Sequence, residues 1–308
     1  MKDYLKLIFV FLLFFASIFL TMSGEVPPIF NYVLFAVVLY FGIFAIQRHE
    51  SKYIKTMLTI GITVQLVFSL AFPYWILHQD MGLNVAWPYF PELLWTAGTM
   101  VAWYLLISFV FIPIIVFLYG RRAWCSFICG TGVMAETLGD EYRKKGAKSN
   151  GIPAFFTALR WIILIASVAL TVAFLAGDPQ NKLLNMIYLI VFIFVLRLFF
   201  MQAVNIILMP KFGTRIWCKY FCPQGLLIGL FSRFGRFALV KNESLCVNCG
   251  TCNQNCSMSI DIANGPTINK SDDCVGCGVC VEVCPNNALS MVTDRQAYQE
   301  KSNLSKTV

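Results

Sequence analysis

Eight of the twelve cysteines lie in two runs of identical spacing near the end of the chain. The runs are Cys246-x2-Cys249-x2-Cys252-x3-Cys256 and Cys274-x2-Cys277-x2-Cys280-x3-Cys284, the second followed by Pro285. In bacterial proteins this spacing lets three thiolates of a run bind three irons of one cubane, while the fourth binds the neighbouring cubane. The runs therefore predict a compact α+β module that holds two [4Fe-4S] clusters.

The crossing of the fourth cysteine assigns a ligand set to each cluster. One set is Cys246, Cys249, Cys252 and Cys284, and the other is Cys274, Cys277, Cys280 and Cys256. Ser257 stands where a proline commonly follows the fourth cysteine, a departure that affects a turn and not a ligand. The alternative metal is zinc, which prefers paired C-x2-C knuckles and often uses histidine. The order of the eight cysteines favours the clusters.

The remaining four cysteines belong to an internal repeat. Residues 120–132 match residues 213–225 at six positions, which are a glycine, an arginine, a tryptophan, two cysteines and a second glycine. Each copy follows a long apolar stretch and contains one C-x3-C pair, Cys125/Cys129 or Cys218/Cys222. The i,i+4 spacing places both sulfurs of a pair on one side of a helical turn.

The two C-x3-C pairs have three candidate uses. If the repeat units face each other, four thiolates can converge on a third [4Fe-4S] cluster, its charge offset by Arg122, Arg215 and Lys219. Dithiol–disulfide chemistry is the second use. The third is a purely structural role for cysteine as a small buried side chain.

Hydropathy separates the rest of the chain from the cysteine runs. The sequence is 58% hydrophobic and 13% charged, which leaves little polar surface for a soluble globule of 308 residues. Six apolar stretches have the roughly 17–25 residues that cross a bilayer, at 4–22, 29–46, 54–77, 93–119, 158–176 and 184–209. We therefore expect a membrane all-α fold of six transmembrane helices. The first stretch could instead be a signal peptide, although its apolar part is long for that role.

Charge in the connecting segments predicts an orientation. Basic residues gather in 48–55, in 121–148 and after residue 211, whereas the opposite loops are mainly acidic. The positive-inside rule then puts both termini and the cysteine runs on the cytoplasmic side of the inner membrane. The expected domains are an N-terminal transmembrane hairpin (1–50), a four-helix membrane domain (51–240), the two-cluster domain (241–292) and a polar tail (293–308).

Several function classes lack their signatures in this chain. The formal charge of +8 comes largely from residues in these loops, so it does not indicate nucleic-acid binding. The only histidines, His49 and His78, lie at opposite ends of one predicted helix, which does not suit a bis-histidine haem. Neither a G-x-G-x-x-G motif nor a P-loop is present.

Two residues of the predicted helices are candidates for a quinone site. Arg197 lies near the middle of the last helix, where a charge costs roughly 2.5–3.5 kcal/mol and needs a partner. It could equally join helices. His78 lies at the outer end of the third helix, where an imidazole could accept a proton from a quinol or serve as an ordinary interfacial residue.

Two C-x3-C motifs after long apolar stretches, followed by the two cysteine runs, resemble the NapH/MauN-type membrane ferredoxins, with related regions in NosR-like proteins. The resemblance covers about 54–292. It implies four core transmembrane helices, a cytoplasmic ferredoxin domain and electron exchange between the quinol pool and a partner. Gly130, where the family usually has proline, and the extra hairpin depart from the pattern. Partnership with a nitrate reductase is therefore not carried over.

These features predict a membrane-bound iron–sulfur electron-transfer protein, a subunit of quinol dehydrogenase type. It would relay electrons between the quinone pool, or a cytoplasmic donor, and a second ferredoxin, a multihaem cytochrome or a reductase subunit. One alternative is a redox sensor or assembly factor for a respiratory oxidoreductase. Another is an anchor that connects a soluble enzyme to the membrane without a quinone site of its own.

Overall fold

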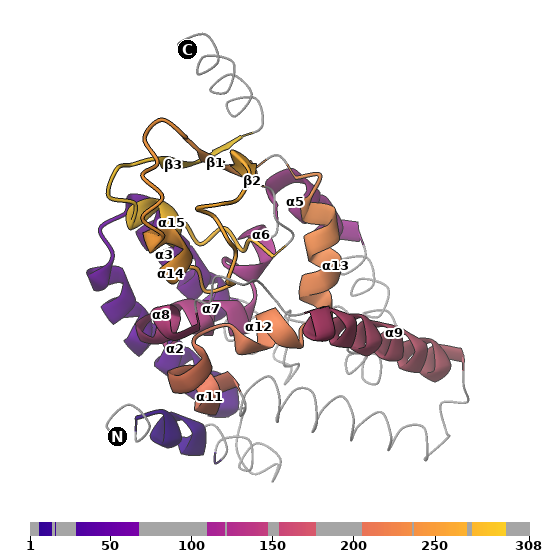
Figure 1. The fold of residues 1–308 in the computed structure, drawn as a ribbon. Helices are drawn as coiled ribbons and strands as arrows, with labels where there is room; N and C mark the ends of the chain where they lie inside the picture. The colour runs from indigo at the N-terminus through magenta and orange to yellow at the C-terminus, as the bar shows by residue number, and fades with distance from the viewer. Residues whose placement is uncertain are drawn as a thin grey trace.

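The computed structural model describes residues 6–13, 16, 29–67, 110–120, 122–146, 154–176, 205–235, 237–269 and 273–293. Over these ranges a set of helices precedes a small sheet, and the sheet lies at one end of the helical part (Figure 1). Arg197 and His78, the two candidates for a quinone site, lie outside the described residues.

The N-terminal helices pack on the first repeat unit. α2 (Ile29–Arg48) and α3 (Lys52–Leu66) form a helical hairpin, and both contact α7 (Gly130–Thr137). Their apolar side chains share a buried cluster with Val133 and Met134 of α7. This packing places the short α2–α3 connection, with His49, beside the cysteine-rich part of the chain.

The two repeat units have the same local backbone. The first contains α5 (Ile112–Tyr119), α6 (Arg122–Cys125) and α7, and the second contains α11 (Asn205–Phe212), α12 (Ile216–Tyr220) and α13 (Pro223–Ser232). The first helix of each unit ends at a glycine with positive φ, 76° at Gly120 and 82° at Gly213. The second cysteine of each pair caps the third helix, with φ, ψ of −64°, 120° at Cys129 and −69°, 108° at Cys222.

The repeat units pack reciprocally. α13 contacts α5, and residues of α7 and α11 share one apolar cluster. A polar contact adds to this interface, because the Thr214 hydroxyl donates to the Ala135 carbonyl at 2.7 Å. η4 (Asp140–Tyr142) and α8 (Arg143–Gly146) continue the first unit, and α9 (Ala154–Ala176) packs along α12 and α13. Because helices of each unit pack against helices of the other, the two C-x3-C segments lie next to each other.

The cysteine runs fold around an antiparallel sheet of order β2-β1-β3. Its strands are β1 (Phe237–Lys241), β2 (Ile268–Asn269) and β3 (Leu289–Thr293). The short helices α14 (Thr251–Gln254) and α15 (Val279–Glu282) each contain the third cysteine of one run. Alternation along β1 sends Leu239 toward cysteines 252, 256, 280 and 284, while Ala238 and Val240 join the opposite face. The sheet therefore supports the cysteines from one side.

The predicted fold of six transmembrane helices is wrong. Among the described residues, no helix combines the length and the apolar character that crossing a bilayer requires. Hydropathy reports how apolar a segment is and not whether one continuous helix covers it, and most of the described helices have only four to ten residues. The predicted orientation was derived from those spans and loses that basis.

Candidate iron–sulfur centres

One cavity of the cysteine-rich domain, the outer cavity, is lined by Cys246, Cys249, Cys252 and Cys284. Its empty volume is about 390 Å³. Three of these cysteines come from the first run and one from the second. Cys249 is exposed, so the outer cavity reaches the surface of the described structure.

A second cavity, the inner cavity, is lined by Cys256, Cys274, Cys277 and Cys280 and has an empty volume of about 480 Å³. Here three cysteines come from the second run and one from the first. The structure thus gathers the eight cysteines into the two groups of four that the crossing pattern predicts. The ligand assignment itself stays a prediction.

Backbone geometry around both cavities suits thiolate ligands. The amide of Ile260 donates to Cys256 Sγ at 3.4 Å, and the amide of Ala288 donates to Cys284 Sγ at 3.3 Å. Glycines with φ of 72° and 81° precede α14 and α15, at Gly250 and Gly278. Left-handed backbone at these turns favours glycine and points the following amides inward. Such amides stabilise the negative charge of an iron–sulfur cluster.

The four C-x3-C cysteines also meet. Cys125, Cys218 and Cys222 are buried in one apolar cluster, and Cys129 packs against it. Burial, followed by the neighbouring Cys218 and Cys125, raises the pKa of Cys129 to about 12. Burial, with the same two neighbours, also raises the pKa of Cys222 well above its ordinary value. The two pairs therefore lie close enough to influence each other across the repeat.

Raised thiol pKa values bear on the alternative uses of these pairs. A reactive dithiol needs a stabilised thiolate in an accessible, electropositive position. Cys125, Cys218 and Cys222 are buried, at 7%, 6% and 9% exposure, and burial raises the pKa of Cys222. The environment is thus unfavourable for dithiol–disulfide exchange. It suits a site in which iron binding releases the protons.

A single metal ion and a cubane differ in how far apart they hold their ligand sulfurs. In the described parts of the chain, no three side chains of the His, Cys, Asp or Glu type converge as ligands of one metal ion. A tetrahedral zinc holds four sulfurs at about 2.3 Å from one centre. A cubane distributes its four thiolates over four separate irons, so the sulfurs stand further apart. The buried Thr131 Oγ1, which has no hydrogen-bond partner in the described part of the chain, lies two residues from Cys129 and is available to such a cluster.

The three groups of cysteines are arranged in order. Cys256 and Cys277 of the inner cavity pack against the same apolar cluster that contains Cys125, Cys218 and Cys222. Met258 and Val275 lie in this cluster too. The inner cavity consequently separates the C-x3-C pairs from the outer cavity.

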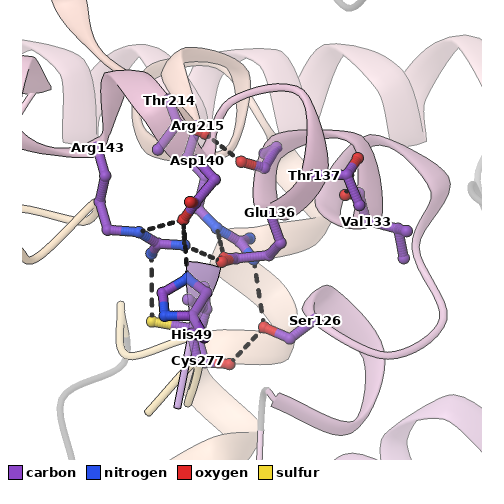
Figure 2. Close-up of polar contacts among 12 residues, drawn as sticks. His49, Ser126, Val133, Glu136, Thr137, Asp140, Arg143, Thr214, Arg215 and Cys277 are labelled. Atoms are coloured by element: carbon purple, nitrogen blue, oxygen red, sulfur yellow. Dashed lines mark hydrogen bonds and ion pairs between the residues drawn. The ribbon is translucent and has the colours of Figure 1, made fainter. Parts of the chain in front are cut away.

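A buried charge network lies where the inner cavity meets the C-x3-C pairs (Figure 2). The carboxylate of Glu136 pairs with both Arg143 and Arg215, and all three side chains are buried. Burial opposes ionisation of Glu136, but the two guanidinium groups outweigh it and lower its pKa. Arg143 Nη1 also approaches Cys277 Sγ at 3.6 Å. The network therefore brings positive charge to the edge of the inner cavity.

His49, in the connection between α2 and α3, extends the network to α15. Its Nδ1 lies 2.5 Å from Glu282 Oε2, and its Nε2 lies 3.1 Å from Asp140 Oδ1. Burial favours the neutral ring, yet the hydrogen bonds and charges of Asp140 and Glu282 outweigh it and raise the pKa of His49. Glu282 also accepts the Glu50 and Ser51 amides, each at 2.8 Å. One histidine thus bridges the first repeat unit and α15 of the cysteine-rich domain.

Most of this network was not predictable from the sequence. Arg215 and Lys219 were expected near the C-x3-C pairs, and both are buried there. Arg143 belongs to the basic segment 121–148, whereas only 4% of this residue is exposed. Glu136 was not singled out. A lone acidic residue within the apolar stretch 130–138 was the one available signal.

Comparison with protein families supports the metal chemistry. A family model described as a 4Fe-4S binding domain matches residues 270–290. A second model with the same description matches residues 101–148 and 194–242, each of which includes one C-x3-C pair. The chain binds [4Fe-4S] clusters.

The chain is similar in sequence to proteins from several organisms. YccM of Escherichia coli, named as an electron transport protein, is 26% identical over 59% of this chain and 52% of its own length. The methylamine utilization ferredoxin-type protein MauN of Paracoccus denitrificans is 28% identical over 59% of this chain and 67% of its own length. This chain therefore spans only about half the length of YccM.

The protein MJ0750 of Methanocaldococcus jannaschii is 30% identical over 60% of this chain and 78% of its own length. The regulatory protein NosR of Stutzerimonas stutzeri is 24% identical over 58% of this chain and 26% of its own length. No solved structure matches the chain. On its motifs and these relatives, the chain belongs to the MauN/NapH/NosR-type family of 4Fe-4S ferredoxins.

Proposed function

We propose that this iron–sulfur electron-transfer protein carries single electrons through three [4Fe-4S] clusters placed in series. The C-x3-C pairs hold the first, the inner cavity the second and the outer cavity the third. The observation that carries this proposal is the shared apolar cluster of Cys125, Cys218 and Cys222 with Cys256 and Cys277. Each step transfers one electron from a reduced cluster to its oxidised neighbour, with no bond made or broken.

The exposed end of the series is the exit or entry point for a soluble partner. Cys249 is exposed, and the neighbouring Val247 and Leu245 are 67% and 48% exposed. A partner redox protein can therefore approach the outer cluster closely. The opposite end is buried between the repeat units and suits a donor or acceptor that meets the helical part.

Iron and sulfide analysis with electron paramagnetic resonance tests the third cluster. The parent protein, purified without oxygen, is expected to contain about twelve irons, four per cubane. The double variant Cys125→Ser/Cys218→Ser should contain about eight and keep the signals of the other two clusters. Met134→Leu, a buried substitution in α7 away from any thiolate, is the control. Eight irons in parent and double variant alike would remove the third cluster from the proposal.

A quinol is the donor we propose for the buried end. Its oxidation to the quinone releases two electrons, which enter the clusters one at a time, and two protons. Support comes from the family resemblance, and from exposed apolar residues of α9, namely Phe155 at 70%, Ile162 at 62% and Ile165 at 65%. Exposed apolar surface of this kind marks contact sites, here with the lipid in which quinols dissolve.

Anaerobic mixing with a quinol tests the donor. Reduction should bleach the clusters at a catalytically useful rate, and the variants His78→Gln and Arg197→Gln should slow bleaching by quinol without slowing reduction by dithionite. Unchanged quinol rates in both variants would separate these residues from the reaction. Absence of bleaching in the parent would exclude the quinol and leave the relay itself intact.

Redox sensing is the second candidate function, favoured by the relative named as the regulatory protein NosR. A sensor needs clusters that change state but does not need sustained turnover. Steady-state electron transfer from reduced protein to an added acceptor distinguishes the two. Many turnovers per cluster support the relay, and a single turnover supports the sensor.

A further inference from the structure

The hydroxyl of Ser257 lies in the wall of the inner cavity and has no hydrogen-bond partner among the described residues. Ser257 follows Cys256 directly, only 1% of it is exposed, and its Oγ is buried and unpaired. The residue lines the cavity together with Cys256, Cys274, Cys277 and Cys280. Buried hydroxyls in folded proteins almost always find a partner. A cluster in this cavity would provide acceptors, which are its sulfides and thiolates.

Neighbouring polar groups do not explain the unpaired hydroxyl. Two residues further on, Ser259 accepts a hydrogen bond from the buried ammonium of Lys219. The amides of Ile260 and Met258 are directed to Cys256 Sγ. This turn therefore directs two backbone amides toward Cys256 Sγ, and the Ser257 hydroxyl is one more donor at the same wall.

The outer cavity differs at the equivalent position. Pro285 follows Cys284 as Ser257 follows Cys256, and it lines the outer cavity. Proline has neither a hydroxyl nor an amide hydrogen to donate. The two cavities, alike in cysteine spacing, therefore differ in this donor.

We infer that Ser257 donates a hydrogen bond to the cluster of the inner cavity and raises its reduction potential. One-electron reduction takes a [4Fe-4S] core from the 2+ to the 1+ state, so with four thiolates the total charge goes from −2 to −3. A donor stabilises the more negative state more strongly, and hydrogen bonds to sulfur are among the features that set cluster potentials. This inference deepens the proposed relay and rests on it, because the inner cluster is the middle step of that relay.

Redox titration followed by electron paramagnetic resonance tests the inference on full-length protein. In Ser257→Ala, one of the one-electron waves should move to lower potential while the others stay in place. We expect a change of about tenfold in the ratio of reduced to oxidised inner cluster at a fixed potential, which corresponds to about 59 mV for one electron. Ser257→Thr keeps the hydroxyl and should keep the parent potential.

Controls separate this effect from a structural one. Ser232→Ala removes another buried hydroxyl, one that donates to the Gly229 carbonyl at 2.7 Å in α13, and should move no wave. If Ser257→Ala loses iron, Ser257→Pro takes its place, since proline already occupies the matching turn after Cys284. An unchanged inner wave in a variant with full iron and sulfide overturns the role of Ser257. Absence of [4Fe-4S] signals from the parent protein instead overturns the relay on which it rests.

Discussion

Arg215 and Glu136 join the two repeat units through a buried ion pair. The guanidinium Nε of Arg215 lies 2.7 Å from Glu136 Oε1, and the two side chains are 0% and 1% exposed. Arg143 contacts the other carboxylate oxygen of Glu136. A carboxylate from the first unit is thus shared by cations from both units, at the edge of the inner cavity.

Glu136→Gln should destabilise the protein strongly. The substitution leaves two guanidinium groups buried without their shared counter-charge, and breaking a buried pair typically costs about 3–5 kcal/mol. Thermal and denaturant unfolding of the cluster-loaded protein measures the loss. The exposed pair of Lys6 with Glu141, at 34% and 38% exposure, gives the control. Lys6→Gln should cost at most about 1 kcal/mol, and equal small losses in both variants would contradict the role of the buried pair.

His49→Gln should change how stability depends on pH. The folded pKa of His49 is raised above its ordinary value by Asp140 and Glu282, so its contribution is fully present below about pH 6.5. That contribution is lost as pH rises through the folded pKa. The parent should therefore lose stability between neutral and mildly alkaline pH, and the variant should show a flatter profile there. Melting temperatures across that range provide the measurement, and parallel curves would argue against a charged His49.

Gly132→Ala should remove the cluster of the C-x3-C pairs alone. A Cβ at Gly132 would lie 1.8 Å from the Cys125 carbonyl oxygen, so the backbone that carries this pair must move. Iron content should fall by about four atoms, the content of one cubane, while the signals of the other two clusters persist. Gly120→Ala is the matched control, because its Cβ meets nothing within 4 Å. Its φ of 76° makes it cost roughly 1–2 kcal/mol without loss of iron.

Tyr53→Phe should loosen the contact between α3 and the second cysteine run. The Tyr53 hydroxyl donates to the Gly276 carbonyl at 2.7 Å. Loss of such a bond costs about 0.5–1.5 kcal/mol, and amide hydrogen exchange around Cys274 and Cys277 should become faster. Tyr40→Phe changes a tyrosine that is 59% exposed and should leave both quantities unchanged. Identical exchange in parent and Tyr53→Phe would show that this hydrogen bond does not hold the domain.

Cysteine spacing made the metal chemistry predictable. Ligands separated by two or three residues are positioned by local turns, so the [4Fe-4S] clusters could be predicted from residues 246–284 alone, and the comparisons confirm them. The internal repeat drew attention to the two C-x3-C pairs, and a cluster shared between them remains a proposal. Apolar composition was a weaker guide. The six-helix membrane fold derived from it is wrong, because no described helix combines the length and the apolar character that crossing a bilayer requires.

Tertiary structure alone decided which charges and donors surround the clusters. Glu136 and Arg215 are 79 residues apart in the chain, and His49 and Glu282 are 233 apart. No sequence pattern links residues so distant, because whether they meet depends on how the helices of the two units pack against each other. Ser257 illustrates the same point. From the sequence, Ser257 was expected to affect only a turn. The cavity that it lines exists because two distant cysteine runs fold onto one sheet.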